Sequence, residues 1–279
     1  MSPAPTGPVL VTGCSSGIGL ATAQALLDRG HVVYASARRP ETLTELGSRG
    51  AHVLALDVTS EESMAVAVKT IEAEHGRVGA LVNNAGYGEY GTIEETDLDK
   101  VRTMFETNVF GLARMSQLVL PGMREAGEGR IVNVGSMGGR FTFPVGGYYH
   151  STKYAVEALS DALRTEVRRF GIGVSLIEPG LIRTEFAGTA LASDGAGTQR
   201  DSPYAALLAS SASNTAGGYG SPFVSASPEA VAKVIRRAIE SRHPRPRYVV
   251  TPTARALIAT RTLGGSRLWD LMMRAQFGS

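Results

Sequence analysis

Short apolar runs alternate with longer amphipathic stretches through most of this chain. The apolar runs fit buried strands and fall at residues 9–11, 31–35, 52–56, 80–82, 130–134, 174–177 and 247–250. Between them, apolar residues recur at helical spacing, at residues 18–27, 41–46, 60–75, 98–120, 149–167 and 227–239. Strands joined so regularly by helices predict a Rossmann-like α/β fold, a doubly wound parallel sheet of about seven strands with helices on both faces.

Breaker residues indicate where several elements end. A Ser-Glu-Glu start at residues 60–62 is typical of a helix N-terminus, and Gly30 and Gly171 follow helical patterns as C-terminal glycines do. Pro121 lies at the end of the long helical pattern over 98–120. Because proline lacks the amide proton that a helix interior uses, we expect that helix to stop there.

Two segments near the C-terminus depart from the alternation. Residues 187–226 consist largely of Gly, Ala, Ser and Thr and are longer than loops inside compact domains normally run. We expect a mobile substrate lid there, with simple disorder as the alternative. Residues 253–279 form a weakly amphipathic, basic tail that includes Trp269, Leu271 and Phe277. This tail could cover the substrate cleft, pack on the body, or contact a partner or a membrane surface.

Length and composition restrict the class of protein. The 279 residues suffice for one large core, and no linker is evident, so residues 1–279 are predicted to form a single domain. A net charge of +2 indicates neither nucleic acid nor an anionic membrane as partner. The single cysteine, Cys14, excludes an internal disulfide, and the five histidines lack metal-ligand spacing. Without a signal-like or bilayer-spanning run, a cytoplasmic location is expected.

A glycine-rich turn follows the first predicted strand. In Thr-Gly-Cys-Ser-Ser-Gly-Ile-Gly at 12–19, the first glycine permits a sharp turn and the later two leave room for a diphosphate at the start of a helix. The alternative is that these glycines merely tighten a strand-to-helix turn. We expect the nucleotide phosphates to be bound by residues of this turn, namely Gly13, Ser15, Ser16, Gly17, Ile18 and Gly19.

A second constellation suits proton transfer. Tyr149 and Lys153 are four residues apart, so a helix would place a phenol and an ammonium on one face. A phenol titrates at about pH 10, and a nearby cation lowers that pKa toward a useful range. Ser136 follows the strand predicted at 130–134 and could share the substrate with them. Tyr148 is a poorer candidate because it is five residues from Lys153, and His150 is expected to point away.

Six short motifs occur in one particular order along the chain. They are the glycine turn at 12–19, Asn-Asn-Ala-Gly at 83–86, Asn108 in Thr-Asn-Val-Phe-Gly, Ser136, Tyr-x-x-x-Lys at 149–153, and Pro179-Gly180. Over roughly residues 8–251 the chain therefore resembles the short-chain dehydrogenases/reductases. Cys-Ser-Ser at 14–16 and the segment 174–180 are most similar to the branch of estradiol-type hydroxysteroid and retinol dehydrogenases.

The resemblance implies roles for four of these residues. It implies that Tyr149 donates or accepts the substrate proton, that Ser136 holds the substrate oxygen, and that Lys153 lowers the tyrosine pKa and binds the nicotinamide ribose. Asn108 would support a water-linked proton path, although a polar residue in a helix often merely bonds to the backbone. Similar proteins also pair through the two long helices that carry Asn108 and Tyr149, so a homodimer or homotetramer is expected.

Cofactor choice is expected to be decided after the second predicted strand. Doubly wound enzymes that bind NAD(H) usually carry an acidic residue there, whereas this chain has Ala37 followed by Arg38, which suits a 2′-phosphate. NADP(H) is therefore preferred, with NAD(H) as the alternative. Asp57 resembles the family residue that hydrogen-bonds the adenine amine, and its alternative role is to cap the next helix. Further cofactor contacts are expected from the ends of other strands and the loops that follow them, at Val58, Asn84, Ala85, Gly86, Pro179, Gly180, Ile182 and Thr184.

The sequence thus predicts an NADPH-preferring oxidoreductase that interconverts a ketone or aldehyde with an alcohol. Its partner would be a small-molecule carbonyl or alcohol substrate. A non-catalytic sensor of nicotinamide nucleotides is the alternative, although a sensor has no need of the Ser136, Tyr149 and Lys153 set. A related epimerase or dehydratase would need a larger C-terminal domain than this chain provides.

Overall fold

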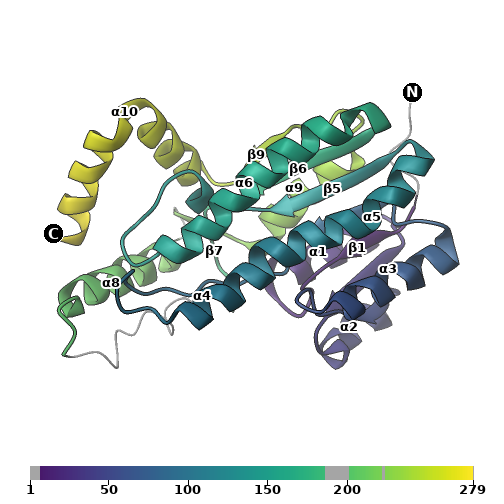
Figure 1. The fold of residues 1–279 in the computed structure, drawn as a ribbon, viewed down its shortest axis with the longest axis horizontal. Helices are drawn as coiled ribbons and strands as arrows, with labels where there is room; N and C mark the ends of the chain where they lie inside the picture. The colour runs from purple at the N-terminus through teal and green to yellow at the C-terminus, as the bar shows by residue number, and fades with distance from the viewer. Residues whose placement is uncertain (1–6, 186–200, 222–223, 279) are drawn as a thin grey trace.

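The computed structural model describes residues 7–185, 201–221 and 224–278. Seven parallel strands form one sheet in the order β3-β2-β1-β4-β5-β6-β9 (Figure 1). Their bounds are β1 Val9–Val11, β2 Val33–Ala37, β3 His52–Ala55, β4 Ala80–Asn83, β5 Gly129–Val134, β6 Ile172–Glu178 and β9 Arg247–Val249. A small second sheet pairs β7 Leu181–Ile182 with β8 Ser225–Ala226. The doubly wound parallel sheet predicted from the alternation is confirmed.

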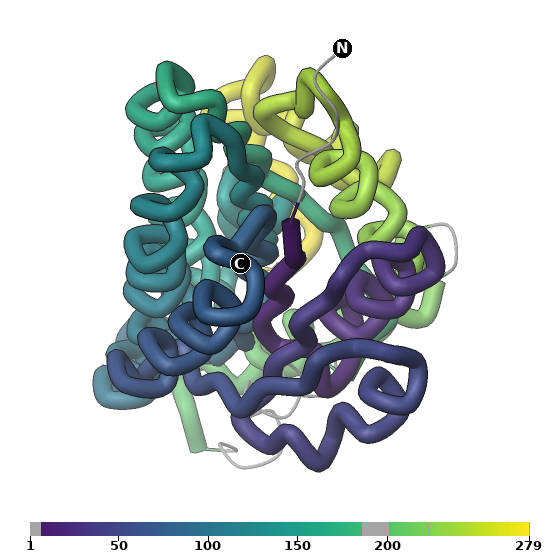
Figure 2. The backbone as a smooth tube through the Cα atoms, turned by 90° about the vertical axis from the view of Figure 1, so that its right-hand side faces the viewer, coloured from purple at the N-terminus to yellow at the C-terminus, as the bar shows by residue number. Residues whose placement is uncertain are grey.

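Helices cover both faces of the sheet. Helices α1 Gly17–Leu27, α2 Thr44–Ser48 and α9 Pro228–Glu240 pack on one face, and α3 Glu61–His75, α5 Leu112–Ala126 and α6 Gly147–Val167 pack on the other. Figure 2 shows the purple α1 and yellow-green α9 on one side of the strands and the teal helices on the other. Because both faces are covered, the central strand β1 is apolar along its whole length, Val9–Val11, and every one of its residues is buried.

The chain reverses direction across the sheet at β1. This strand pairs with β2 on one side and with β4 on the other, so the connections that follow β1 and β4 diverge. Ligands of doubly wound sheets bind in the crevice that such a switch point leaves beyond the carboxyl ends of the strands. The glycine turn at 12–19 follows β1 at this point.

The long helical pattern after β4 differs from the prediction in two ways. Helix α4 Leu98–Phe105 passes through a π-helical stretch, Glu106–Gly111, before α5 begins. Pro121 does not end the helix, because α5 continues to Ala126. Pro121 and Gln117, four residues before it, are both exposed. The carbonyl that proline leaves unpaired can therefore bond to water while Met115, Val119 and Met123 keep the helix on the core.

The predicted mobile lid, residues 187–226, lies partly outside the described residues. Its described part is not an irregular loop, because it contains the helix α8 Ala205–Gly220. Alanine favours helix formation even where apolar periodicity is weak, and Leu208 and Ser211 are the buried residues of this helix.

The C-terminal tail forms one long element, α10 Pro252–Phe277, which turns sharply at Gly265, where φ is 64°. Trp269 anchors it to the loop after β5: its ring lies 4.8 Å from that of Phe141, between centroids, and its Nε1–H donates to the carbonyl oxygen of Thr142 at 3.0 Å. The tail therefore packs on the body. Among the described helices, none combines the length and hydropathy that crossing a bilayer requires.

Candidate active site

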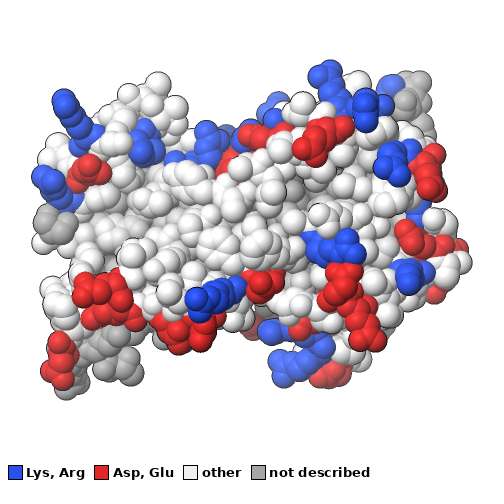
Figure 3. Space-filling model, viewed as in Figure 1, with Lys and Arg blue, Asp and Glu red and all other residues white. Residues whose placement is uncertain are grey.

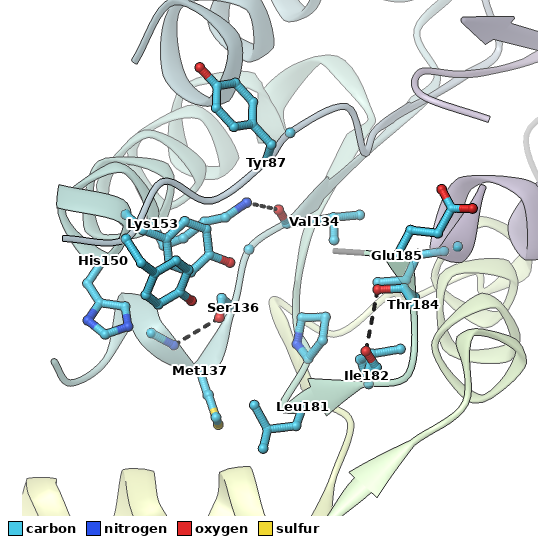
Figure 4. A pocket seen from close by; sticks show the side chains of 18 of the residues that line it. Tyr87, Val134, Ser136, Met137, His150, Lys153, Leu181, Ile182, Thr184 and Glu185 are labelled. Carbon is cyan, nitrogen blue, oxygen red and sulfur yellow. Dashed lines mark hydrogen bonds between the residues drawn. The ribbon is translucent and has the colours of Figure 1, made fainter. Parts of the chain in front are cut away.

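A cavity of about 940 Å³ opens at the switch point of the sheet. Figure 4 shows Ser136, His150 and Lys153 on one side of it and Ile182, Thr184 and Glu185 on the other. Nearly all the predicted cofactor-binding residues line this cavity: Gly13, Ser15, Ser16, Gly17, Ile18, Arg38, Asp57, Val58, Asn84, Ala85, Gly86, Tyr149, Lys153, Pro179, Gly180, Ile182 and Thr184. The exception is Gly19, which lies behind the glycine turn.

The glycine turn has the geometry that a diphosphate requires. Gly13 adopts a φ of +72°, and a Cβ atom there would lie 2.9 Å from the Cα atom of Ala85. A Cβ atom on Gly19 would lie 2.1 Å from the carbonyl oxygen of Gly13, so Gly19 permits helix packing rather than ligand contact. Ser16 begins α1 without a side-chain hydrogen bond to the first turn, and that turn carries no acidic residue. Because Ser16 and Gly17, at the start of α1, line the cavity, the positive end of the helix faces it.

Asn84 fixes this turn to the end of β4. Its Nδ2 donates to the carbonyl oxygens of Thr12 and Gly13 at 2.9 and 3.0 Å. In return, the Thr12 hydroxyl oxygen accepts the backbone N–H groups of Asn84 and Ala85, both at 3.0 Å. Sequence reasoning missed Thr12, whose side chain is buried between two strands that are neighbours only in the folded sheet.

Arg38, Asp57 and Val58 form the far end of the cavity. The Arg38 side chain is exposed and follows the buried Ala37 at the end of β2. The Asp57 carboxylate accepts hydrogen bonds from the N–H and the hydroxyl of Thr59 at 2.9 and 2.7 Å. Ser60, not Asp57, is the N-cap of α3. The alternative role of Asp57 as a helix cap is therefore excluded.

Tyr149, Lys153 and Ser136 come together at the other end. Tyr149 and Lys153 lie on the first turns of α6, with the lysine Nζ 5.9 Å from the centre of the tyrosine ring. Lys153 Nζ also donates to the carbonyl oxygen of Val134 at 3.1 Å, at the end of β5. The Ser136 hydroxyl accepts the N–H of Gly138 at 3.0 Å and is hydrogen-bonded to Tyr149. The structure thus brings the predicted phenol, ammonium and hydroxyl into one place.

The electrostatics of this group differ from the prediction. Burial raises the pKa of Tyr149 above its ordinary value, and the hydrogen bond with Ser136 offsets this in part. The same burial lowers the pKa of Lys153 to about 8. The pKa of Tyr149 is therefore raised rather than lowered here, because removal from water is the largest influence on both groups, and the role of Lys153 in lowering the tyrosine pKa stays a prediction.

Asn108 lies behind the cavity wall rather than in it. Its side chain is buried in the π-helical stretch. There it donates to the carbonyl oxygen of Tyr87 at 2.8 Å and to the Thr152 hydroxyl at 3.2 Å, and it accepts the N–H of Tyr87 at 3.0 Å. These contacts fix the segment after β4 to α6. The side chain thus holds these two segments together, chiefly through the backbone of Tyr87, and its part in a water-linked proton path stays a prediction.

Tyr90 and Tyr219 were not predicted to lie near Tyr149, and the orientation of His150 was predicted wrongly. The ring of Tyr90 stacks on that of Tyr149, and Tyr219 lines the cavity from the end of α8. His150 does not point away as expected. It is buried, lines the cavity, and its Nδ1 accepts the N–H of Phe143 at 3.2 Å. The loop before α6 folds back around the first helical turn, so neighbouring residues on that turn both face the cavity.

The cavity therefore joins a polar region, formed by a helix N-terminus and Arg38, to a more apolar region around Tyr149. Met137, Phe143, Leu181, Leu257 and Phe277 line the apolar region, the last two from α10. A dinucleotide fits the polar region because the glycines leave space for its diphosphate. A carbonyl group next to Tyr149 and Ser136 could then exchange a proton with the phenol.

Comparisons with known proteins agree with this arrangement. Residues 8–194 match the family described as short chain dehydrogenase. The chain is 42% identical to a 3-ketodihydrosphingosine reductase of Bacteroides thetaiotaomicron over 178 residues, 64% of this chain and 65% of that protein. It is 35% identical to the NADPH-dependent 3-dehydrocapnine reductase of Ornithobacterium rhinotracheale over 272 residues, 94% of each chain.

A solved structure is similar over nearly the whole length. A short-chain dehydrogenase from Streptomyces avermitilis superposes with a TM-score of 0.81 at 32% identity, covering 98% of this chain and 97% of that one. The family match, these identities and the cavity geometry lead to one conclusion. The chain belongs to the short-chain dehydrogenase/reductase family and is an NAD(P)-dependent oxidoreductase.

Proposed function

We propose that the protein is an NADPH-preferring reductase of ketones or aldehydes, with Tyr149 as general acid/base. The observation that carries this proposal is the convergence of Tyr149, Ser136 and Lys153 in the cavity that the glycine turn enters. When bound there, the nicotinamide supplies or accepts the hydride at the carbonyl carbon. The protein's contribution is to orient the substrate oxygen and to move its proton.

Each of the three residues has a separate task in this proposal. Ser136 holds the substrate oxygen by a hydrogen bond, next to the phenol. Tyr149 donates the proton that the oxygen needs as the alcohol forms, and its raised pKa keeps that proton on the phenol at neutral pH. Lys153, held by the carbonyl oxygen of Val134, places its ammonium beneath the phenol and would stabilise the phenolate after proton transfer.

The preference for NADPH is proposed on the basis of Arg38. The end of β2 carries Ser36, Ala37 and Arg38 and no carboxylate that would bind a ribose 2′-hydroxyl. A guanidinium at the cavity edge can bind a 2′-phosphate with two parallel hydrogen bonds. The 3-dehydrocapnine reductase to which the chain is similar is named as NADPH-dependent, which supports the same choice.

The substrate proposed for this site is a ketone or aldehyde on an apolar chain. The space beyond Tyr149 is bounded by Met137, Phe143 and Leu181, and α10 adds Leu257 and Phe277. Such walls favour a substrate with a long apolar part over a small polar one. Two relatives are named as reductases of 3-keto or 3-dehydro compounds, which supports the reductive direction. Steroids and retinoids, suggested by the sequence resemblance, belong to the same apolar class.

A homodimer or homotetramer is also proposed, paired through α4, α5 and α6. Large apolar side chains lie exposed on these helices and the π-helical stretch between them: Leu98, Phe110, Tyr154 and Leu159 are 52%, 56%, 43% and 38% exposed. Figure 3 shows a broad band without charged side chains across this face. Monomers rarely leave an apolar patch of this kind uncovered.

The experiment that tests the proposal is an NADPH oxidation assay with a panel of carbonyl compounds. The panel contains long-chain 3-ketones, steroid ketones, retinal and short aliphatic ketones, and absorbance of the reduced nicotinamide is followed. We expect turnover that rises with the apolar length of the substrate. NADPH binding without turnover on any panel member would favour the nucleotide sensor instead.

A further inference from the structure

The outer face of α10 carries exposed leucines that the cavity does not use. Leu263 is 88% exposed, Leu271 63% and Leu268 42%. Leu263 has the largest exposed fraction among the exposed large apolar residues in the described part of the chain. It lies two residues before the sharp turn at Gly265, which divides α10 into two helical segments (Figure 1).

The second half of α10 has two apolar stripes. Trp269, Met273 and Phe277, spaced four residues apart, form the inner stripe that packs on Phe143 or faces the cavity. Leu268, Leu271 and Ala275 recur at three- and four-residue spacing on the opposite side and are all exposed. A helix that is apolar on two faces needs a partner on each of them. The body of the protein covers only the inner face.

The charge of α10 is concentrated and positive. The helix contains Arg255, Arg261, Arg267 and Arg274 against one acidic residue, Asp270, a formal charge of +3. Because the whole chain carries +2, the remainder is close to neutral at −1. The net charge of +2 led us to expect no anionic partner, but it is the sum of a strongly basic α10 and a nearly neutral remainder. Within the described part of the chain, none of the four arginines forms an ion pair.

We propose that the outer face of α10 docks on an anionic lipid bilayer. Leu263, Leu268 and Leu271 would enter the interfacial region, and Arg267 and Arg274 would lie at the level of the phosphate headgroups. In the second half of α10, the exposed Leu268 and Leu271 lie between Arg267 and Arg274 in the sequence, which is the pattern of interfacial helices, in which apolar burial and attraction to anionic lipid add. Figure 3 shows blue side chains around uncharged atoms at this end of the molecule.

Charge complementarity favours a bilayer over a second copy of the chain. If two copies met through this face about a twofold axis, each would bring its own +3 helix against the other, which costs electrostatic energy. An anionic bilayer instead gains from the arginines at the level of its headgroups, Arg267 and Arg274. The uncharged face on α4, α5 and α6 is a separate surface, and it lacks this concentration of arginine.

The position of α10 gives the docking a consequence for the reaction. Leu257 and Phe277 of the same helix line the cavity, so α10 forms the wall between the cavity and the proposed bilayer. A long-chain apolar ketone dissolves in the bilayer far better than in water. Docking would therefore bring the cavity close to the phase that holds most of such a substrate. This consequence depends on the proposed function, but the docking itself does not.

Co-sedimentation with lipid vesicles tests the docking directly. The full chain is mixed with vesicles of phosphatidylcholine alone or of equal parts phosphatidylcholine and phosphatidylglycerol. We expect binding to the anionic vesicles that weakens as salt is raised, and little binding to phosphatidylcholine. Replacing Leu263, Leu268 and Leu271 together by serine should lower the partition coefficient by tenfold or more. Arg267→Glu with Arg274→Glu should lower it by about 30-fold or more, since the loss of two arginines alone accounts for that factor.

Two control variants distinguish an effect of the α10 face from the general effect of a changed net charge or of a lost exposed apolar side chain. Lys233→Glu with Arg237→Glu changes two exposed residues of α9 and makes the same change in net charge, and Val66→Ser removes an exposed apolar side chain from α3. Both should bind vesicles as the parent does. NADPH oxidation with a short, water-soluble ketone should be unchanged in all variants, so loss of binding is distinguishable from loss of the proposed activity.

Three results would overturn the proposal. They are no sedimentation with anionic vesicles, equal loss of binding in the α9 control, and unchanged binding in both α10 variants. Light scattering of the parent and of the serine variant measures the number of subunits and so distinguishes a bilayer from a second copy of the chain as the partner of this face. If replacing the leucines reduces the number of subunits, a second copy of the chain covers this face and the bilayer does not.

Discussion

The ring of Tyr90 stacks on the ring of Tyr149, with 5.5 Å between their centroids and 29° between their planes. Tyr90 belongs to the segment after β4, whereas Tyr149 is on α6, so the contact joins two separate parts of the cavity wall. Asn108 fixes that same segment to α6 through Tyr87 and Thr152. The orientation of the proposed proton donor is therefore set by aromatic packing as well as by its helix.

Truncating Tyr90 should therefore reduce catalysis while a ring at that position preserves it. Aromatic pairs contribute about 1 kcal/mol beyond their buried area. We expect Tyr90→Ala to lower kcat/KM by about tenfold, and Tyr90→Phe to stay within about threefold of the parent. Steady-state kinetics with the best carbonyl substrate provide the measurement. Equal losses in the two variants would show that the hydroxyl, not the stacking, is what matters.

Arg38 should determine the choice between NADPH and NADH. Removing its guanidinium deletes the proposed partner of the 2′-phosphate, so Arg38→Ala should weaken NADPH binding by about 10- to 100-fold and leave NADH binding nearly unchanged. Arg39→Ala is the matched control, because Arg39 is also exposed but does not line the cavity. Titration of nucleotide fluorescence measures both. A similar loss for both nucleotides in Arg38→Ala would contradict the assignment.

The glycine turn and the Tyr149–Lys153 pair were predictable because each depends on local spacing. A strand, a tight turn and a helix N-terminus are adjacent in sequence, and four residues on a helix necessarily share a face. The parallel sheet was predictable for a similar reason, since strands and helices alternate regularly. Each of these features is specified by residues that lie close together in the sequence.

The remaining features depend on contacts between distant segments. Pro121 stays within α5 because core packing on either side of it outweighs the lost hydrogen bond. Val145 adopts a φ of +71°, which a β-branched residue avoids unless its surroundings impose it. Its carbonyl oxygen accepts the N–H of Gly91, more than fifty residues away. The places of Tyr90, Tyr219 and His150 in the cavity depend on the same kind of long-range folding.

Because Lys153 is buried, its ammonium form should lower the free energy of unfolding at pH values below about 8. Its pKa in the folded protein is about 8, below the ordinary 10.5, so the unfolded chain binds more protons between these values and stability rises with pH across them. Lys153→Met should raise the free energy of unfolding by about 1–3 kcal/mol at pH 7, and the gain should vanish above pH 10.5.

Denaturant unfolding of the nucleotide-free protein at several pH values measures this effect. Lys69→Met is the control, because it makes the same substitution at an exposed lysine of α3. If Lys153→Met destabilised the protein at neutral pH, the buried ammonium would have to be a net stabilising group.

A buried carboxyl pair beneath the active site should show the opposite dependence. Burial and the neighbouring Glu178 raise the pKa of Glu157 to about 7 from 4.5, so its proton is held in the folded state. Stability then falls as pH rises from 4.5 through 7. Glu157→Gln should be more stable than the parent by about 1–2 kcal/mol at pH 8 and equal to it at pH 4.5.

Asp161→Asn provides the comparison for this pair. Arg247 bonds to both Glu157 and Asp161, but hydrogen bonding to Arg247 lowers the pKa of Asp161, so removing its charge should destabilise the protein at pH 8. Thermal unfolding at the two pH values distinguishes the variants. Loss of stability in Glu157→Gln at both pH values would mean that its ion pair with Arg247 dominates.

The central claim is that the Tyr149 phenol passes a proton to the substrate oxygen next to bound NADPH. The most direct measurement is single-turnover oxidation of NADPH by Tyr149→Phe, with nucleotide affinity measured on the same preparation. We predict that NADPH binding is retained within a few-fold while the rate of turnover falls by about 10³-fold, the contribution expected of a positioned general acid. Turnover at the parental rate by a variant that binds NADPH normally would contradict the account.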